Sequence, residues 1–222
     1  MTEIYHRING SEYRNIFIVG DLHGCYNRLM TQLDELQLDR KRDLLISVGD
    51  LIDRGAQSLE CLDLITEKWF ACVRGNHEQM AIDALAGRNV DLWFYNGGDW
   101  FNRLDYEQEI LAKALIARAG SLPYVIELET NAKRIVIAHA DYPDNQYEFG
   151  KEIDLHETVW SRERFGMLGE DMGDKINGAD AFYFGHTPIQ RKWSPFNLNY
   201  IDTGAVFGNL LTIVQVQGGA NG

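Results

Sequence analysis

The sequence predicts an α/β protein whose first half forms a parallel β-sheet. Three short apolar segments, at residues 16–19, 44–48 and 70–73, have the length of buried strands. Each is followed by a polar loop and then by apolar residues at helical spacing, with Ser58 as the expected N-cap of the second helix. Three consecutive strand–loop–helix units predict parallel strands joined by right-handed crossovers. Their carboxyl ends then meet at one edge of the sheet, where α/β proteins bind ligands.

The rest of the chain is less regular, but no linker divides its 222 residues, so we expect one domain. Residues 88–121 predict a helical insert beside the ligand-binding edge, and we interpret its aromatic side chains as core. Residues 142–180 are polar and irregular, with one short amphipathic piece near residues 158–160. Further strands are expected at residues 124–128, 134–138, 181–184, 198–201 and 211–216.

The composition excludes several classes of protein. A formal net charge of −12 argues against nucleic-acid binding, which needs a basic face. The longest apolar runs have the length of strands, and the N-terminal residues contain no apolar signal region, so neither membrane insertion nor secretion is expected. Cys25, Cys61 and Cys72 form no zinc-type pair and are expected to be reduced. We therefore expect a cytoplasmic protein, in the host cytoplasm if a phage encodes it.

The stretch Asp50-Leu51-Ile52-Asp53-Arg54-Gly55 directly follows the second predicted strand. It brings two carboxylates and a guanidinium to the carboxyl end of a central strand. Buried charges are costly unless they are paired. Two divalent cations and a phosphate would satisfy all three side chains.

Four of the six histidines follow apolar segments, each at a polar loop of the same kind. Nitrogen and oxygen ligands without a thiolate suit manganese, iron or zinc. Asp50 is expected to bridge two metals, with Asp21 and His23 on one metal and the remaining ligands on the other. The predicted dinuclear site has the ligands Asp21, His23, Asp50, Asn76, His139 and His186.

Such a site can hydrolyse a phosphate ester. A hydroxide held between two metals is a nucleophile at neutral pH and can attack phosphorus in line. His77 is the candidate general acid for the leaving group, and Asp53 is expected to hold its ring. Arg54 and Arg74 are candidates to clamp the phosphate with forked hydrogen bonds.

These motifs resemble the signature of the PPP family of metal-dependent protein phosphatases. Gly-Asp-Leu-His-Gly, Gly-Asp-Leu-Ile-Asp-Arg-Gly and Arg-Gly-Asn-His-Glu occur in the family's order and are followed by two further histidines. Val-Arg-Gly-Asn-His-Glu-Gln-Met, Gly-His-Thr-Pro and Ile-Asp-Thr-Gly-Ala-Val-Phe are similar to the bacteriophage lambda type of this family. The resemblance covers nearly the full chain. It implies a single calcineurin-like metallophosphoesterase domain over residues 1–222, a β-sandwich flanked by α-helices in α/β/β/α order.

The same resemblance implies a substrate class and a third phosphate contact. The expected substrates are phosphoproteins with phosphoserine or phosphothreonine, and phosphotyrosine is a further candidate. Two ions, manganese first and iron or zinc as alternatives, would be bound by the ligands named above. Arg162 matches the position of a later phosphate-binding arginine, although it could instead pair with Glu157 or Glu163, and Arg164 is a rival. We expect no obligate regulatory subunit.

Three other functions are alternatives for a chain with these motifs. A diadenosine tetraphosphate hydrolase would use the same metal chemistry, so the core motifs do not separate it from a protein phosphatase. An inactive phosphoprotein-binding module would have lost a ligand or His77, and all are present. A His-Glu-x-x-His metalloprotease is excluded because Ala81 occupies the position of the second histidine.

Overall fold

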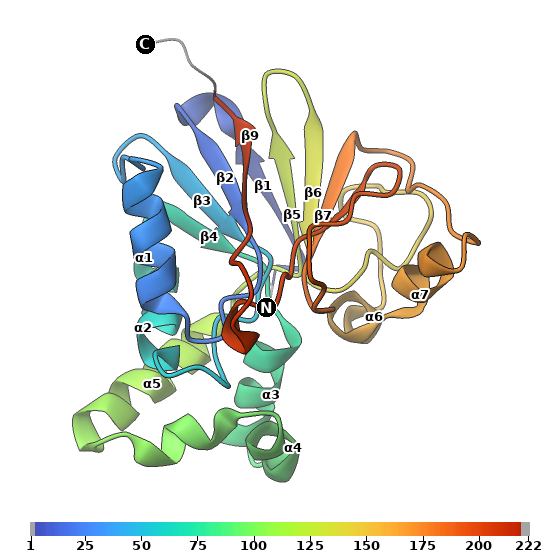
Figure 1. Ribbon diagram of the computed structural model, residues 1–222. Helices are drawn as coiled ribbons and strands as arrows, with labels where there is room; N and C mark the ends of the chain where they lie inside the picture. The colour runs from blue at the N-terminus through green and yellow to red at the C-terminus, as the bar shows by residue number, and fades with distance from the viewer. Residues whose placement is uncertain (1–2, 219–222) are drawn as a thin grey trace.

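The computed structural model describes residues 3–218 and contains two β-sheets that pack face to face, with helices on the outer sides (Figure 1). The smaller sheet has the order β4–β3–β2–β9. Strands β2, β3 and β4 are parallel, as the three strand–loop–helix units predict, and β9 runs antiparallel to β2. The bounds of these strands are β2 Ile16–Val19, β3 Leu44–Ser47, β4 Phe70–Cys72 and β9 Ile213–Gln217.

The larger sheet has the order β1–β5–β6–β7–β8 and is mixed. β5 and β6 match two of the expected strands and pair antiparallel, and the other three pairings are parallel. The edge strand β1 was not predicted, because only two of its five side chains are buried and the apolar alternation is weak. The bounds are β1 Tyr5–Asn9, β5 Val125–Glu129, β6 Arg134–Ala138, β7 Ala181–Phe184 and β8 Leu198–Tyr200.

Helices cover both outer faces of the sandwich, so the implied α/β/β/α order is confirmed. Residues 155–169 contain two helices where one short amphipathic piece was predicted. Ser58 is the first residue of α2 rather than its N-cap, and its hydroxyl accepts a hydrogen bond from the Asp53 N–H at 2.9 Å. The helices are α1 Tyr26–Glu35, α2 Ser58–Asp63, α3 Asn76–Leu85, α4 Val90–Tyr95, α5 Tyr106–Ala119, α6 Leu155–Trp160 and α7 Glu163–Gly169.

The alternation of side chains along β2 explains the layered core. Ile16 and Ile18 point to the cluster between the two sheets, where residues of both sheets meet. Phe17 and Val19 point to the opposite face and pack with residues of α1, α2 and α5. A third cluster lies between the larger sheet and the α6–α7 side of the molecule. β2 is therefore buried on both faces, as expected for a central strand.

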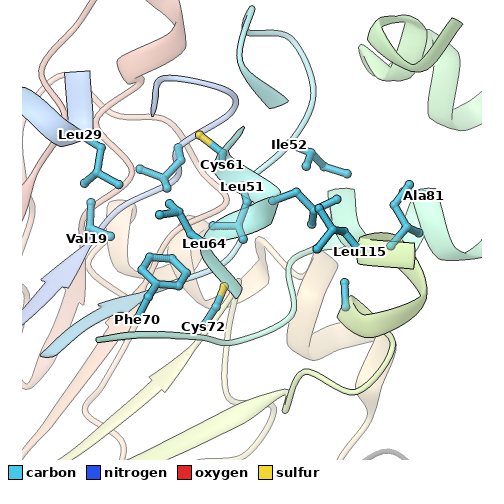
Figure 2. Packing of buried hydrophobic residues seen from close by; sticks show 14 of the residues in the cluster. Val19, Leu29, Leu51, Ile52, Cys61, Leu64, Phe70, Cys72, Ala81 and Leu115 are labelled. Atoms are coloured by element: carbon cyan, nitrogen blue, oxygen red, sulfur yellow. The ribbon is translucent and has the colours of Figure 1, made fainter. Parts of the chain in front are cut away.

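The loop after β3 is anchored in the core by its own apolar residues. Leu51 and Ile52 are completely buried, and Figure 2 shows them among the side chains that the first helices and strands contribute to the cluster. Asp50 and Asp53 flank this anchored pair in the sequence. Burial of Leu51 and Ile52 therefore fixes the positions from which the two carboxylates project. In residues 3–218 no helix is long and apolar enough to span a membrane.

Candidate metal centre

Loops from both sheets converge at one edge of the sandwich and carry the predicted ligands. The loop after β2 holds Asp21 and His23, and the loop after β3 holds Asp50. Asn76 and His77 open α3, directly after β4. The larger sheet supplies the other two ligands, because His139 follows β6 and His186 follows β7. All six predicted ligands are buried, and the most exposed of them, His186, is only 6% accessible.

Asp50 lies between two groups of potential ligand atoms. One group combines Asp50 with His23 and His77, and the other combines Asp50 with His139 and His186. Its Oδ2 is 3.6 Å from His23 Nε2, whereas its Oδ1 is 3.3 Å from His139 Nε2. One oxygen of the carboxylate therefore faces each group, and the bridging role of Asp50 stays a prediction.

Asn76 joins the second group through its amide oxygen. This Oδ1 lies 2.8 Å from His139 Nε2 and 3.0 Å from His186 Nδ1. Asp21 accepts a hydrogen bond from the backbone N–H of His186, with its Oδ2 at 3.0 Å. Among residues 3–218, Asp21 belongs to neither three-residue ligand group. Its predicted pairing with His23 on one metal therefore stays a prediction.

The tautomers of two histidines show that the site fits a cation. Nδ1 of His139 donates to the carbonyl of Val48, and Nδ1 of His23 donates to the carbonyl of Ile52, each at 2.8 Å. A carbonyl can only accept, so the second nitrogen of each neutral ring carries a lone pair. The lone pair of His23 Nε2 accepts from Arg54 Nη1 at 2.6 Å, whereas that of His139 Nε2 faces two acceptors, Asp50 Oδ1 at 3.3 Å and Asn76 Oδ1 at 2.8 Å. Lone pairs directed at one another inside a protein need a cation between them, and hydrogen-bonded histidines of this kind are typical metal ligands.

The carboxylates of the site also indicate a missing positive charge. Burial raises the pKa of Asp21 well above its usual value, and the nearby charges of Asp202 and Asp50 raise it further. Burial likewise raises the pKa of Asp202 to about 6. Burial opposes ionisation of Asp50 as well, and the neighbouring histidines outweigh it and lower the pKa of Asp50 only in their protonated form. Divalent cations would stabilise all three carboxylates in their charged form.

The two arginines predicted to clamp phosphate lie in different environments. Arg54 is exposed beside the site, and its Nη1 is 2.6 Å from His23 Nε2. Arg74 is 4% exposed, and its guanidinium donates to the carbonyls of Gly120 and Leu122 and to two side-chain oxygens near α3. This position does not support the prediction that Arg74 binds phosphate. These bonds engage both terminal nitrogens, whereas the buried Nε has no hydrogen-bond partner among the described residues, so phosphate binding by Arg74 stays a prediction.

Arg162 and Arg164 are also distinguished by their contacts. Arg164 donates to the carboxylate of Asp141 at 2.8 Å and to nearby backbone carbonyls, so its donors are engaged away from the ligand groups. Arg162 is exposed, and its Nη2 donates to the carbonyl of His186 at 3.4 Å. Of the two, Arg162 is the one that contacts a predicted metal ligand, and its role in phosphate binding stays a prediction.

The predicted acid pair is in hydrogen-bonding contact. Nδ1 of His77 lies 2.6 Å from Oδ2 of Asp53, and both side chains are buried. Burial raises the pKa of Asp53, although the hydrogen bonds that it accepts oppose this effect. Two of those bonds come from Trp93 and Trp100, which were predicted only as core residues. Both indoles are indeed buried, and nothing in the sequence indicates that their N–H groups point at a carboxylate.

Unusual backbone conformations concentrate at the site. His23, Asp50, Asp53, Arg54 and His186 account for five of the nine non-glycine residues of the described chain that have a positive φ. Such conformations cost about 1–3 kcal/mol each and persist where the surroundings impose them. The buried carboxylate of Glu78 holds Asp50 in its positive-φ conformation, because it accepts the N–H groups of Asp50 and Leu51 at 2.9 and 2.8 Å. Glu78 was not predicted to belong to the site.

Comparisons with known proteins agree with this geometry. The family model of calcineurin-like phosphoesterases matches residues 14–190. Serine/threonine-protein phosphatase 1 of Salmonella typhimurium is 50% identical over 215 residues, which cover 97% of this chain and 98% of that protein. The bis(5'-nucleosyl)-tetraphosphatase PrpE of Halalkalibacterium halodurans is 29% identical over 89% of this chain and 88% of its own length.

A solved structure of a putative diadenosine tetraphosphatase shares the fold, with a TM-score of 0.68 at 19% identity, over 99% of this chain and all of that chain. The resemblance to metal-dependent protein phosphatases that the motifs indicate is thereby confirmed. The match over residues 14–190 and the 50% identity over nearly the whole chain place this protein in the calcineurin-like phosphoesterase family.

Proposed function

We propose that this protein is a metal-dependent protein phosphatase that hydrolyses phosphoserine and phosphothreonine monoesters, with phosphotyrosine as a further substrate to test. The observation that carries the proposal is the set of buried histidine and carboxylate acceptors around Asp50, bordered by two exposed arginines. The 50% identity to a serine/threonine-protein phosphatase over nearly the full length of both proteins supports this choice of substrate.

Each group of site residues has a separate role in hydrolysis. Two divalent cations, when bound, would supply an activated water at neutral pH and neutralise charge on the phosphoryl oxygens. Arg54 and Arg162 present guanidinium groups that can hold a phosphate monoester by forked hydrogen bonds. His77 donates a proton to the departing serine or threonine oxygen, while Asp53 orients its ring through Nδ1. The Nε2 of His77 lies 3.9 Å from Asp50 Oδ2, so the acid faces the predicted bridging ligand.

Manganese is our first candidate metal, and iron or zinc are alternatives, because the donors are nitrogen and oxygen atoms without a thiolate. Phosphoproteins are the proposed partners, and a regulatory subunit is not required by this scheme. The excess of acidic residues argues against nucleic acid as a substrate. A cytoplasmic location would give the enzyme access to phosphoproteins and remains part of the proposal.

A dinucleoside tetraphosphate hydrolase is the second candidate, because a PrpE-type tetraphosphatase and a putative diadenosine tetraphosphatase structure both align with most of the chain. The metal chemistry would be the same, and only the group beyond the phosphate would differ. Identity to the tetraphosphatase is 29%, against 50% to the protein phosphatase, which favours the latter.

The test is phosphate release by the metal-stripped protein, with and without added manganese. A phosphoserine peptide, a phosphotyrosine peptide and diadenosine tetraphosphate are offered in parallel. Manganese-dependent release from the phosphoserine peptide is the expected result, and the phosphotyrosine arm reports dual specificity. Cleavage of the dinucleotide alone would overturn the substrate class. Tight metal binding without any turnover would instead support a phosphoprotein-binding module.

A further inference from the structure

The carboxylate of Asp53 accepts more hydrogen bonds than a simple partner of His77 needs. Asp53 is completely buried. Besides His77 Nδ1 at 2.6 Å, it accepts the indole N–H of Trp100 at 2.7 Å on Oδ1 and that of Trp93 at 3.0 Å on Oδ2. Trp93 is also 3.1 Å from Oδ1 and so spans both oxygens. Three N–H donors on one carboxylate fix the plane of the carboxyl group as well as its position.

Both indoles come from the helical insert, which contributes none of the predicted metal ligands. Trp93 lies in α4, and Trp100 lies in the 3-10 helix Gly98–Arg103 that follows it. The two rings meet edge to face, with their centroids 6.3 Å apart. A Cβ atom on Gly98 would lie 2.6 Å from the Trp93 ring, so this glycine lets the chain pack directly on the indole. The insert thus holds the two donors as one unit.

The same insert is attached to the loop that carries Asp53. The backbone N–H of Arg54 donates to the carbonyl of Gly97 at 3.2 Å. Gly97 has a φ of 107°, and a Cβ atom there would lie 2.8 Å from the backbone nitrogen of Arg54. Asp53 and Arg54 themselves have positive φ values of 77° and 69°. Contacts with the insert therefore support two consecutive strained residues, one in the acid pair and one in the phosphate clamp.

We propose that Trp93 and Trp100 are positioning residues for leaving-group protonation: they hold the Asp53 carboxylate so that His77 directs Nε2 at the departing oxygen. This inference rests on the proposed phosphatase function. In the step concerned, His77 starts with a proton on each ring nitrogen. The attacking water gives one proton to solvent, its oxygen forms a bond to phosphorus, and the bond from phosphorus to the serine oxygen breaks. The serine oxygen keeps that electron pair and takes the proton from His77 Nε2. Inorganic phosphate and serine leave, and His77 remains neutral with Nδ1–H on Asp53.

The two indoles matter only where the leaving group needs a proton. A serine alkoxide is a poor leaving group and depends on a well-directed acid, whereas p-nitrophenolate departs without one. A carboxylate that loses one of its fixed donors can rotate, and the ring of His77 then follows it. The proposed effect is therefore a fall in kcat for phosphoserine with little change for p-nitrophenyl phosphate.

The experiment compares these two substrates for Trp93→Phe and Trp100→Phe in the manganese-loaded enzyme. Each change removes one N–H from Asp53 and is expected to lower kcat for a phosphoserine peptide about tenfold, the loss typical of one charge-assisted hydrogen bond. With p-nitrophenyl phosphate, kcat should change less than about twofold, because the phenolate needs no acid. Trp69→Phe is the matched control, since its buried indole donates to Glu67 at 2.9 Å and no metal-centre residue takes part in that bond.

Two further measurements separate positioning from a loss of packing. Replacing either tryptophan with 3-benzothienylalanine keeps the ring shape and removes the donor, so it should reproduce the phenylalanine variant even where phenylalanine destabilises the fold. In a His77→Asn background, neither tryptophan change should lower kcat further, because the indoles act through His77. Equal losses on both substrates, or an unchanged kcat for phosphoserine, would overturn the inference. A wild-type enzyme that leaves phosphopeptides uncleaved would instead refute the proposed function.

Discussion

The two ends of strand β3 carry buried aspartates with opposite surroundings. Asp43, at the amino end, accepts hydrogen bonds from two guanidinium nitrogens of Arg14 at 2.9 and 2.6 Å, from Asn15 and from the backbone N–H of Asp39. Asp50, at the carboxyl end, accepts the backbone N–H of His77, and its oxygens otherwise face the ring nitrogens of His23 and His139 at 3.6 and 3.3 Å. Both are almost fully buried, at 1% and 2% exposure.

The comparison shows that burial of a charge does not identify a functional site, whereas the type of its neighbours does. A buried carboxylate surrounded by donors is a structural element, because the protein itself compensates the charge. A buried carboxylate surrounded by acceptors needs a cation, which the chain does not supply. Substitution at the two ends of β3 should therefore separate stability from function.

The largest effect is expected for Asp50→Asn. Loss of the carboxylate between the two ligand groups should abolish binding of at least one metal, and kcat/KM for a phosphoserine peptide should fall by more than about 10⁴-fold, since metal catalysis contributes several kcal/mol. Added manganese should also raise Tm less than in the wild type, because ligand binding stabilises the fold only through the metal sites that remain. Metal content by elemental analysis checks the cause. Two bound metals in an inactive Asp50→Asn variant would contradict the bridging role.

His77→Asn should have the next largest effect. As the general acid, His77 contributes about 10²–10⁴-fold to turnover of a serine ester, and its loss should leave the bound metals in place. The structure makes this a discriminating test, because Nε2 of His77 also lies close enough to Asp50 to belong to a possible ligand group. Metal content of the purified variant decides between the two roles, and loss of a metal would make His77 a ligand.

Arg54 and Arg74 should respond differently to alanine. Arg54→Ala should lower kcat/KM about 10–100-fold at unchanged Tm, because an exposed guanidinium loses its hydrogen bonds to phosphate. Arg74→Ala should lower the free energy of unfolding by about 3 kcal/mol, because the hydrogen bonds of the buried guanidinium to the part-buried carbonyls of Gly120 and Leu122 are lost. Thermal unfolding and steady-state kinetics on both variants test this contrast. A raised KM with normal stability for Arg74→Ala would restore the clamp that the sequence predicted.

The features that the sequence predicted are those with a local signal. The three parallel units and their loops were predicted because strand, motif and helix are contiguous, and the order of those units settles which side chains converge. Strand β1 was missed because its partner β5 lies about half the chain away, where Tyr5 pairs with Val125. The two glycines of α7 weaken its helical pattern in the same way, so tertiary packing decides its conformation.

Side-chain direction was the main feature of the site that the sequence could not predict. Arg54 and Arg74 occur in similar motifs, and only the fold shows that the second turns toward the carbonyls at the end of α5. Trp93 and Trp100 have the spacing of core residues and are buried, yet their N–H groups are directed at Asp53. A pattern of residue types contains no information on where one polar atom of a buried ring points.

The smallest effect on catalysis is expected at the amino end of β3. Asp43→Asn should leave kcat and the manganese-induced rise in Tm unchanged, while the free energy of unfolding falls by about 2–3 kcal/mol, because hydrogen bonds to a charged group are lost. Burial alone would raise the pKa of Asp43, but its bonds to Arg14, Asp39 and Asn15 prevail and lower it.

This lowered pKa gives the stability a defined dependence on pH. A carboxyl group whose pKa is lower in the folded state stabilises the fold fully above its unfolded value of about 3.9, and this contribution is lost as the pH falls through the folded value. Urea unfolding at a series of pH values should therefore show that the free energy of unfolding falls less steeply toward acid pH for Asp43→Asn than for the wild type. If the free energy of unfolding depended on acid pH identically in both proteins, or if the variant lost metal binding, the two ends of β3 would not divide stability from function as the structure indicates.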